Sequence, residues 1–169
     1  MDTVVSLRCH CPSILKRWAT RHRHWPPPVI VQRVVSFGAN VTPVGFKGSE
    51  FKQIEWRICF NTGETELVKN LNATQAKVYV LLKMIVKDVL RLCKKEITSY
   101  VMKNIVFWQA ERNPQNTFSA KSLVHWLHDG LRELTTAIVK QQLSYYMIPD
   151  RNLMAENGLQ EHQRSDTTL

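Results

Sequence analysis

The chain has 169 residues, of which 44% are hydrophobic and 22% are charged, so it is long enough to bury a core and is not of the disordered class. It has no apolar run of the roughly 18 residues that a membrane span needs and no signal-peptide pattern at its start, so we expect an intracellular protein, cytoplasmic or nuclear, without a membrane partner. The formal net charge of +9 favours a polyanionic partner such as nucleic acid, although charge also serves solubility alone.

The first third of the chain predicts short strands and connecting segments. Residues 1–7 alternate as a strand does, whereas residues 18–28 combine arginines and histidines with three prolines, which cannot continue a helix, and therefore predict a connector. Residues 29–37 predict a short helix that ends at Gly38. Residues 41–44 predict an edge strand, because Pro43 has no N–H to donate to a neighbouring strand.

Two groups of residues in this part are similar to known kinds of functional site, a zinc site and a nucleotide-binding loop. The first group could bind zinc and consists of Cys9, Cys11, His22 and His24. The single-residue gap within each pair is tighter than the usual spacing of structural zinc ligands, so we predict no metal site and interpret these residues as packed thiols and a solvated basic loop. The second group, Gly48-Ser49, is interpreted as a surface turn, because the paired carboxylates that hold two metal ions on a triphosphate do not follow it closely.

The longest helical pattern follows a short apolar strand that starts at Glu55, and it extends to Leu92. Asn72 and Gln75 form a capping-box pattern at its start. At 100° per residue, ten apolar residues fill an arc of about 180° and predict a core-facing side. They are Val78, Tyr79, Leu81, Leu82, Ile85, Val86, Val89, Leu90, Leu92 and Cys93. On the opposite side the pattern predicts a basic ridge, which with the residue after it consists of Lys83, Lys87, Arg91, Lys94 and Lys95.

The remaining sequence predicts two further long helices. Thr98 or Ser99 caps the first, and Asn113-Pro114 ends it. Ser119 caps the second, whose apolar residues are Leu123, Trp126 or Leu127, Leu131, Leu134 and Ile138. We interpret Trp108 and Trp126 as core anchors rather than a ligand cage. We interpret His125 and His128 as surface residues or as residues with satisfied hydrogen bonds, rather than as ligands. The expected fold is mainly α, a compact helical bundle with a short N-terminal α+β remnant.

Several segments together carry a resemblance to a known family. They are Glu55-Trp56-Arg57-Ile58-Cys59-Phe60, Gln75, Lys77, Tyr79, Leu82-Lys83-Met84-Ile85, Ser99-Tyr100, Lys103, Trp108, Tyr145-Tyr146-Met147-Ile148-Pro149 and Asn152-Leu153. In these segments the chain resembles the Mab-21-like family, which includes cyclic GMP-AMP synthase and its relatives. The resemblance implies that residues 1–62 are the last part of a nucleotidyltransferase core, that residues 63–155 are a helix-hairpin-helix-like C-terminal lobe, and that residues 156–169 are a disordered tail.

The resemblance also bears on catalysis. The family's catalytic core uses a Gly-Ser loop, two nearby carboxylates and a third carboxylate on a later strand, and only the third is identified here, as Asp2. One carboxylate does not hold two divalent ions, so we expect a catalytically incomplete chain without a cofactor, either a truncated product or an incomplete gene model. Mg or Mn would serve only a full-length parent. Leu71-Asn72-Ala73-Thr74 passes directly into a helix where the vertebrate synthase inserts a zinc loop, so DNA recognition by that loop is not expected.

Three functions and a neutral alternative follow, and the third function, nucleotide transfer by this chain itself, is the least expected. In the first, the chain is part of an innate immune sensor resembling the cyclic GMP-AMP synthase-like receptors and binds double-stranded RNA or DNA. The basic ridge and a basic loop, consisting of Lys16, Arg17, Arg21 and Arg23, then contact phosphates without reading sequence. In the second, the chain resembles the developmental Mab-21 members and binds a protein partner. In the neutral alternative, the ridge is a solvated helix face.

Overall fold

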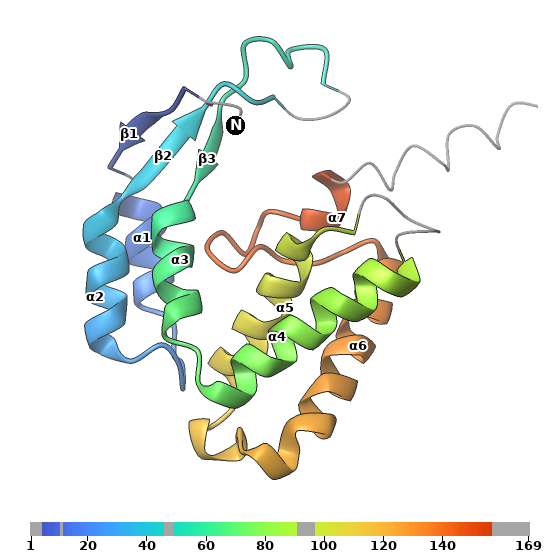
Figure 1. Cartoon of the computed structure of the whole chain (residues 1–169). Coiled ribbons are helices and arrows are strands. Elements are labelled where there is room, and N and C mark those ends of the chain that lie inside the picture. The colour runs from blue at the N-terminus through green and yellow to red at the C-terminus, as the bar shows by residue number, and fades with distance from the viewer. Residues whose placement is uncertain (1–4, 11, 46–48, 91–96, 157–169) are drawn as a thin grey trace, which may run out of the picture. The chain divides into compact units, whose positions relative to one another are not determined.

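The computed structural model describes residues 5–10, 12–45, 49–90 and 97–156 (Figure 1). The chain divides into two compact units, Met1–Asn70 and Leu71–Leu169, called here the N-terminal and the C-terminal unit. The described residues are mostly helical, with one small antiparallel sheet in the N-terminal unit, which confirms the predicted fold class. Within these residues no helix combines the length and the apolar character needed to cross a membrane.

The described residues of the N-terminal unit form a three-stranded antiparallel sheet. Its strands, in spatial order, are β1 (Leu7–Cys9), β2 (Ala39–Thr42) and β3 (Arg57–Cys59). Val41 of β2 pairs with Leu7 on one side and with Ile58 on the other. The prediction of an edge strand at residues 41–44 is therefore wrong: β2 is central, and it ends before Pro43, so the proline interrupts neither ladder.

Two helices of this unit were not predicted. The first, α1 (Pro12–Ala19), begins with a proline, which suits the first helical turn, and it contains Trp18, which the sequence placed in a connector. The second, α3 (Asn61–Lys69), lies between β3 and the long helix, where a direct turn was expected. Gly63 weakens its helical pattern but is needed, because a Cβ there would lie 3.0 Å from Cγ1 of Val34.

The third helix of the unit, α2 (Pro28–Phe37), confirms its prediction and ends as expected. Gly38 follows it with φ of 69°, a left-handed conformation that favours glycine, and its N–H donates to the carbonyl of Val35 at 3.2 Å. α2 packs against α3. The buried apolar residues of the unit include Leu15, Trp18, Trp25, Ile30, Val34, Phe60 and Leu67.

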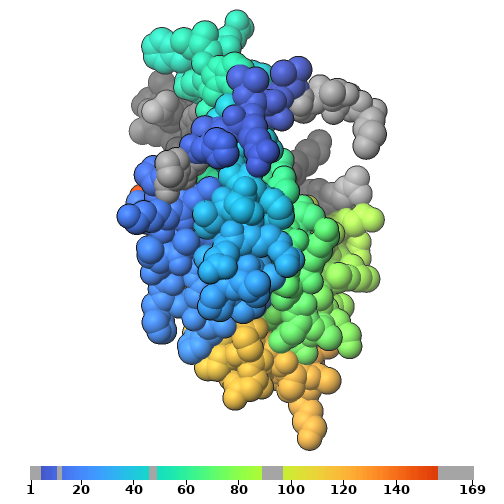
Figure 2. All heavy atoms as spheres, turned by 90° about the vertical axis from the view of Figure 1, so that its left-hand side faces the viewer, coloured from blue at the N-terminus to red at the C-terminus, as the bar shows by residue number. Residues whose placement is uncertain are grey.

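The segment between β2 and β3 projects apolar side chains into solvent. Phe51, Ile54 and Trp56 are exposed on it. Figure 2 shows this segment, in teal, at one end of the surface of the N-terminal unit. Ser49 starts a turn there, as predicted: its Oγ accepts a hydrogen bond from the N–H of Phe51 at 3.1 Å and donates one to the carboxylate of Glu55.

The C-terminal unit is built from three long helices. They and the shorter elements are α4 (Ala73–Ile85), the π-helical turn η1 (Val86–Leu90), α5 (Ser99–Arg112), the 3-10 turns η2 (Gln115–Thr117) and η3 (Ala120–Ser122), α6 (Leu123–Lys140) and α7 (Leu153–Glu156). The capping box at the start of α4 is confirmed, with two hydrogen bonds of 2.9 Å between Asn72 and Gln75. The predicted ends of α5 are also confirmed, with Thr98 before it and Asn113 after it.

The apolar side of α4 faces the core, where α4 packs against both α5 and α6. Of the ten residues predicted to face inward, six have described side chains, and none of these six is exposed; Val78, Leu82 and Val86 are buried. The other four lie outside the described side chains. Gly130 of α6 is buried where the helices meet. A Cβ at this position would lie 2.9 Å from Cδ1 of Leu82, so the close approach of the two helices requires a glycine.

Buried polar groups fix the segment after α6 against α5. Oδ1 of Asn104 accepts a hydrogen bond from the backbone N–H of Tyr146 at 2.8 Å. The Tyr146 hydroxyl donates to Oε2 of Glu111 at 2.7 Å, and all three residues are buried. The chain after Lys140 is thereby held beside α5, which positions Leu143 and Ser144 in the lining of a cleft described below.

Candidate functional site

The outer side of α4 and η1 carries two of the predicted basic residues. Lys83 and Lys87 are exposed and lie one helical turn apart, on the side away from the buried residues Val78, Leu82 and Val86. These two lysines are called the α4 ridge below. Nζ of Lys83 lies 5.1 Å from the ring centroid of Tyr79, a cation–π contact that orients the lysine stem. The other predicted ridge residues, Arg91, Lys94 and Lys95, lie outside the described residues.

Apolar side chains accompany the α4 ridge. Val80 is 51% exposed and Met84 is 54% exposed, although both belong to the same helix. Asp88 is also exposed, beside Lys87, and its carboxylate reduces the positive charge at this end of the ridge. The outer side of α4 is therefore a mixed surface, basic and partly apolar, rather than a purely polar helix face.

The four arginines and lysines of the basic loop have two different settings. Lys16 and Arg17 are exposed in the last turn of α1. Arg21 and Arg23 are half-buried, and the guanidinium of Arg23 lies 4.5 Å from the ring centroid of Trp18, where it also donates to the backbone carbonyls of Arg21 and Trp18. Arg23 therefore stabilises the turn after α1, and the exposed pair is better placed for a partner.

The segment that follows α1 also borders a pocket. Arg21, Arg23 and His24 line it together with Pro26, Pro27 and Pro28, and its volume is about 510 Å³. The His22 and His24 rings pack edge to face, with centroids 6.2 Å apart. Within the described residues no three His, Cys, Asp or Glu side chains are grouped as a metal site would require. Cys11, one of the four residues considered as zinc ligands, and Asp2, the predicted catalytic carboxylate, both lie outside the described residues.

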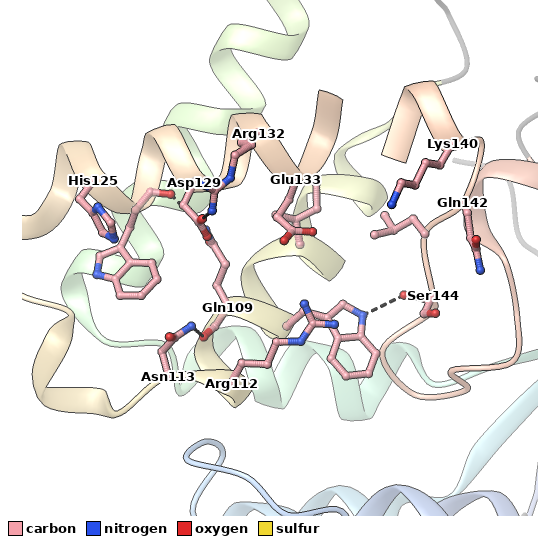
Figure 3. Close-up of a pocket in the computed structure, with 14 residues that line it drawn as sticks. Gln109, Arg112, Asn113, His125, Asp129, Arg132, Glu133, Lys140, Gln142 and Ser144 are labelled. Atoms are coloured by element: carbon pink, nitrogen blue, oxygen red, sulfur yellow. Dashed lines mark hydrogen bonds and ion pairs between the residues drawn. The ribbon is translucent and has the colours of Figure 1, made fainter. Parts of the chain in front are cut away.

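A cleft of about 460 Å³ lies between α5, α6 and the segment after α6 in the C-terminal unit (Figure 3). It is called the α5–α6 cleft below. Its polar lining includes Gln109, Arg112, Asn113, Asp129, Glu133 and Lys140. Trp108, predicted to be a core anchor, is half-buried and lines the cleft, whereas Trp126 is buried as predicted. His125 and His128 are exposed, as predicted, and His125 lies at the cleft.

Hydrogen bonds fix one end of this cleft. Nε2 of Gln109 donates to Oδ2 of Asp129 at 2.9 Å and to the backbone carbonyl of Trp126 at 3.1 Å. Arg132 donates to the other carboxylate oxygen of Asp129. The charge of Asp129 is thus compensated within the protein, and the side chains at this end form a preorganised wall.

At the other end, an aromatic ring supports an arginine. Nε1 of Trp108 donates to the backbone carbonyl of Ser144 at 2.9 Å, and the guanidinium carbon of Arg112 lies 5.0 Å from the Trp108 ring centroid. Figure 3 shows the Glu133 carboxylate and the Lys140 ammonium directed toward the same hollow. Arg112, Glu133 and Lys140 therefore surround a common space, with the arginine held in place by the indole.

The α5–α6 cleft was not predicted from the sequence, because its charged residues come from different helices. Glu133 and Lys140 are seven residues apart on α6 and so share a helix side, which was a signal in the sequence. Arg112, however, stands in the last turn of α5, where a basic residue is common for reasons of helix stability alone. Only the packing of α5 against α6 brings the three side chains together.

Comparison with known protein families gives two matches. Residues 65–168 match the Mab-21 protein HhH/H2TH-like domain. Residues 1–70 match the Mab-21 protein nucleotidyltransferase domain. The larger match includes all helices of the C-terminal unit described above and contains both the α4 ridge and the α5–α6 cleft.

Proposed function

Because the chain belongs to the Mab-21 family, we propose that its C-terminal unit binds double-stranded nucleic acid, RNA or DNA, through the α4 ridge. The observation that carries this proposal is the exposure of Lys83 and Lys87 on one side of a helix whose other side is buried. The net charge of +9 favours a polyanionic partner. The proposed biological role is that of part of an intracellular cyclic GMP-AMP synthase-like receptor in innate immunity.

The chemistry of the ridge suits phosphate groups rather than bases. A lysine ammonium is a compact charge on a flexible stem, so it reaches a phosphate oxygen without demanding a fixed geometry. Contacts of this kind position a protein on a duplex but carry no sequence information. The exposed pair Lys16 and Arg17 in the N-terminal unit offers the same chemistry. Binding is therefore proposed to be similar for duplexes of unrelated sequence.

The test is fluorescence anisotropy with labelled duplexes of two unrelated sequences, each made as RNA and as DNA. We expect the double variant Lys83→Glu/Lys87→Glu to bind about tenfold or more weakly, to the same extent for every sequence. The control Lys52→Glu/Lys121→Glu changes the net charge equally, at two exposed lysines that lie in other segments, and should lose much less affinity. Equal losses in both variants, or no binding by the wild type, would contradict the proposal.

The exposed apolar residues of α4 favour a second candidate, a protein-interaction scaffold of the developmental Mab-21 type. Val80 and Met84 present apolar area that a protein partner would cover, whereas phosphates gain nothing from it. The test is affinity capture after nuclease treatment, with wild type and Val80→Ser/Met84→Ser compared. A partner that survives nuclease and is lost with the variant would support the scaffold. Recovery that disappears with nuclease would favour nucleic acid.

We also propose that this chain alone does not transfer nucleotides. Support comes from the acidic residues of the N-terminal unit, among which Glu64 is buried and Glu66 pairs with Arg33. Asp2 was the one carboxylate that the sequence matched to the family's catalytic set, and a set for two divalent ions needs several. Incubation with ATP, GTP, Mg or Mn and duplex nucleic acid is expected to give no cyclic dinucleotide. Detection of that product would overturn this proposal.

A further inference from the structure

The α5–α6 cleft has the character of a second binding site, and it shares no residue with the α4 ridge. We propose that it binds an acidic segment of a partner protein as an extended peptide. This proposal does not depend on nucleic-acid binding by the ridge. Its basis is the combination of charge, hydrogen-bonding groups and shape that the cleft brings together.

The excess positive charge of the cleft favours a ligand that carries a carboxylate. Asp129 is compensated by Arg132, which leaves Arg112, Lys140 and Glu133 around the hollow. No ion pair joins Glu133 to either cation among the described residues, so the cleft holds two cations against one half-buried carboxylate. An acidic side chain of a peptide would compensate the excess charge by pairing with Arg112 or Lys140. Glu133 would accept a hydrogen bond from a backbone N–H of the same peptide.

The neutral groups of the cleft suit a peptide backbone. Amide side chains both donate and accept hydrogen bonds, as peptide groups do, and Asn113 and Gln142 supply them along the lining. The amide nitrogen of Gln109 is already used by Asp129 and the carbonyl of Trp126. The half-buried side chain of Trp108 adds apolar surface that would contact one aliphatic side chain. Amides, charges and apolar surface within one cleft suit a peptide that carries both acidic and aliphatic residues.

The length of the cleft and the negative charge of Glu133 in its lining favour a peptide over a nucleic acid as the ligand. The α6 residues of the cleft run from His125 to Lys140, which at the rise of an α-helix is about 22 Å. An extended peptide of about seven residues has this length. A nucleic-acid strand would bring phosphates beside Glu133, whose carboxylate would repel them. A peptide with spaced carboxylates avoids that repulsion.

The proposal is tested with the full chain and a probe heptapeptide, acetyl-Gly-Ser-Glu-Leu-Glu-Ser-Gly-amide. The measurement is a titration followed in ¹H–¹⁵N correlation spectra, which detects weak binding. We expect the largest shifts at amides of residues 105–113 and 125–144. The variants Arg112→Gln and Lys140→Gln are each expected to weaken binding about threefold to tenfold, because each removes one charge-assisted contact. Lys121→Gln, outside the lining, is the matched control and should leave binding unchanged.

Two further arms identify the ligand chemistry. The same peptide with glutamine in place of both glutamates should not bind measurably, and inorganic tripolyphosphate should not compete with the acidic peptide. Arg112→Lys, which keeps the charge, should recover part of the affinity that Arg112→Gln loses. Equal binding of the glutamine peptide, displacement by tripolyphosphate, or shifts outside the cleft would overturn the proposal, and so would the absence of any shift. Because the α4 ridge is untouched in these variants, their duplex binding reports on the proposed function separately.

Discussion

The carboxylate of Glu66 in α3 accepts a hydrogen bond from Nη1 of Arg33 in α2 at 2.6 Å. This hydrogen bond, with the positive charge of the same guanidinium, lowers the pKa of Glu66 from its usual value against the opposing effect of desolvation. Because the folded pKa lies below the unfolded one, the pair contributes stability at pH values above the usual glutamate pKa. That contribution is lost as the pH falls through the lowered pKa.

A test at the residue scale follows from this pair. Arg33→Ala should raise the pKa of Glu66 toward its ordinary value, because the main cause of the shift is removed. An NMR titration of the Glu66 side-chain carboxyl carbon measures the change directly. Asn70, whose amide also donates to Glu66, provides the control: Asn70→Ala should raise the pKa by less than Arg33→Ala does. An unchanged pKa in Arg33→Ala would contradict this account of the contact.

Single residues also show which features a sequence can reveal. Asn72 and Gln75 were predicted as a capping box because their hydrogen bonds depend only on residues three apart in one helix turn. The exposed positions of Lys83 and Lys87 followed in the same way from helical periodicity. Arg112 was overlooked as a cleft residue, because Glu133, Lys140 and Ser144 on the other side of the cleft lie on α6 or after it, and only tertiary packing brings them close.

At the scale of elements, α4 and α6 meet through a glycine and a leucine. A Cβ at Gly130 would lie 2.9 Å from Cδ1 and 3.4 Å from Cδ2 of Leu82, a fully buried side chain. Gly130→Ala gains up to about 1 kcal/mol of helix propensity. Overpacking of a full core costs about 1–3 kcal/mol, so we expect a net loss of about 1 kcal/mol of unfolding free energy.

A double-mutant cycle separates these two terms. Leu82→Ala alone should lose about 2–5 kcal/mol through the cavity it leaves. In the background of Leu82→Ala, Gly130→Ala should no longer destabilise, because the new methyl group enters that cavity. Urea unfolding of the four proteins measures the coupling. Additive changes in the unfolding free energy would show that Gly130 and Leu82 are not energetically coupled and would contradict this account of the α4–α6 contact.

Elements with a long, regular apolar pattern were the predictable part of the fold. α4, α5 and α6 were expected with their inward sides, because each buries one stripe against the others. The cap predicted for α6 was wrong, because Ser119 caps the 3-10 turn η3 and α6 itself begins after Ser122. α3 was missed because it has only nine residues and carries Gly63 near its start. The central place of β2 was missed because the order of strands depends on pairing with segments far away in the sequence.

At the scale of the whole molecule, the division into two compact units predicts that the C-terminal unit folds and binds a duplex on its own. The C-terminal unit has its own buried set, which includes Val101, Met102, Phe107, Tyr146 and Met154. We expect residues 71–169 to fold alone, with a helical circular dichroism spectrum and a cooperative thermal transition. This fragment should retain duplex binding but show a smaller salt dependence than the full chain, because it lacks Lys16 and Arg17. An unfolded fragment would contradict the independent folding of the C-terminal unit. A fragment with an unchanged salt dependence would contradict a contribution of Lys16 and Arg17 to duplex binding.

The proposed function depends most on phosphate contacts made by the α4 ridge, and the salt dependence of duplex binding measures those contacts. For the wild-type chain, the logarithm of the association constant should fall linearly with the logarithm of salt concentration. For Lys83→Glu/Lys87→Glu the slope should be smaller in magnitude by about two, close to one for each lost lysine contact. Identical slopes for the two proteins would show that Lys83 and Lys87 do not contact the duplex and would contradict the proposed function.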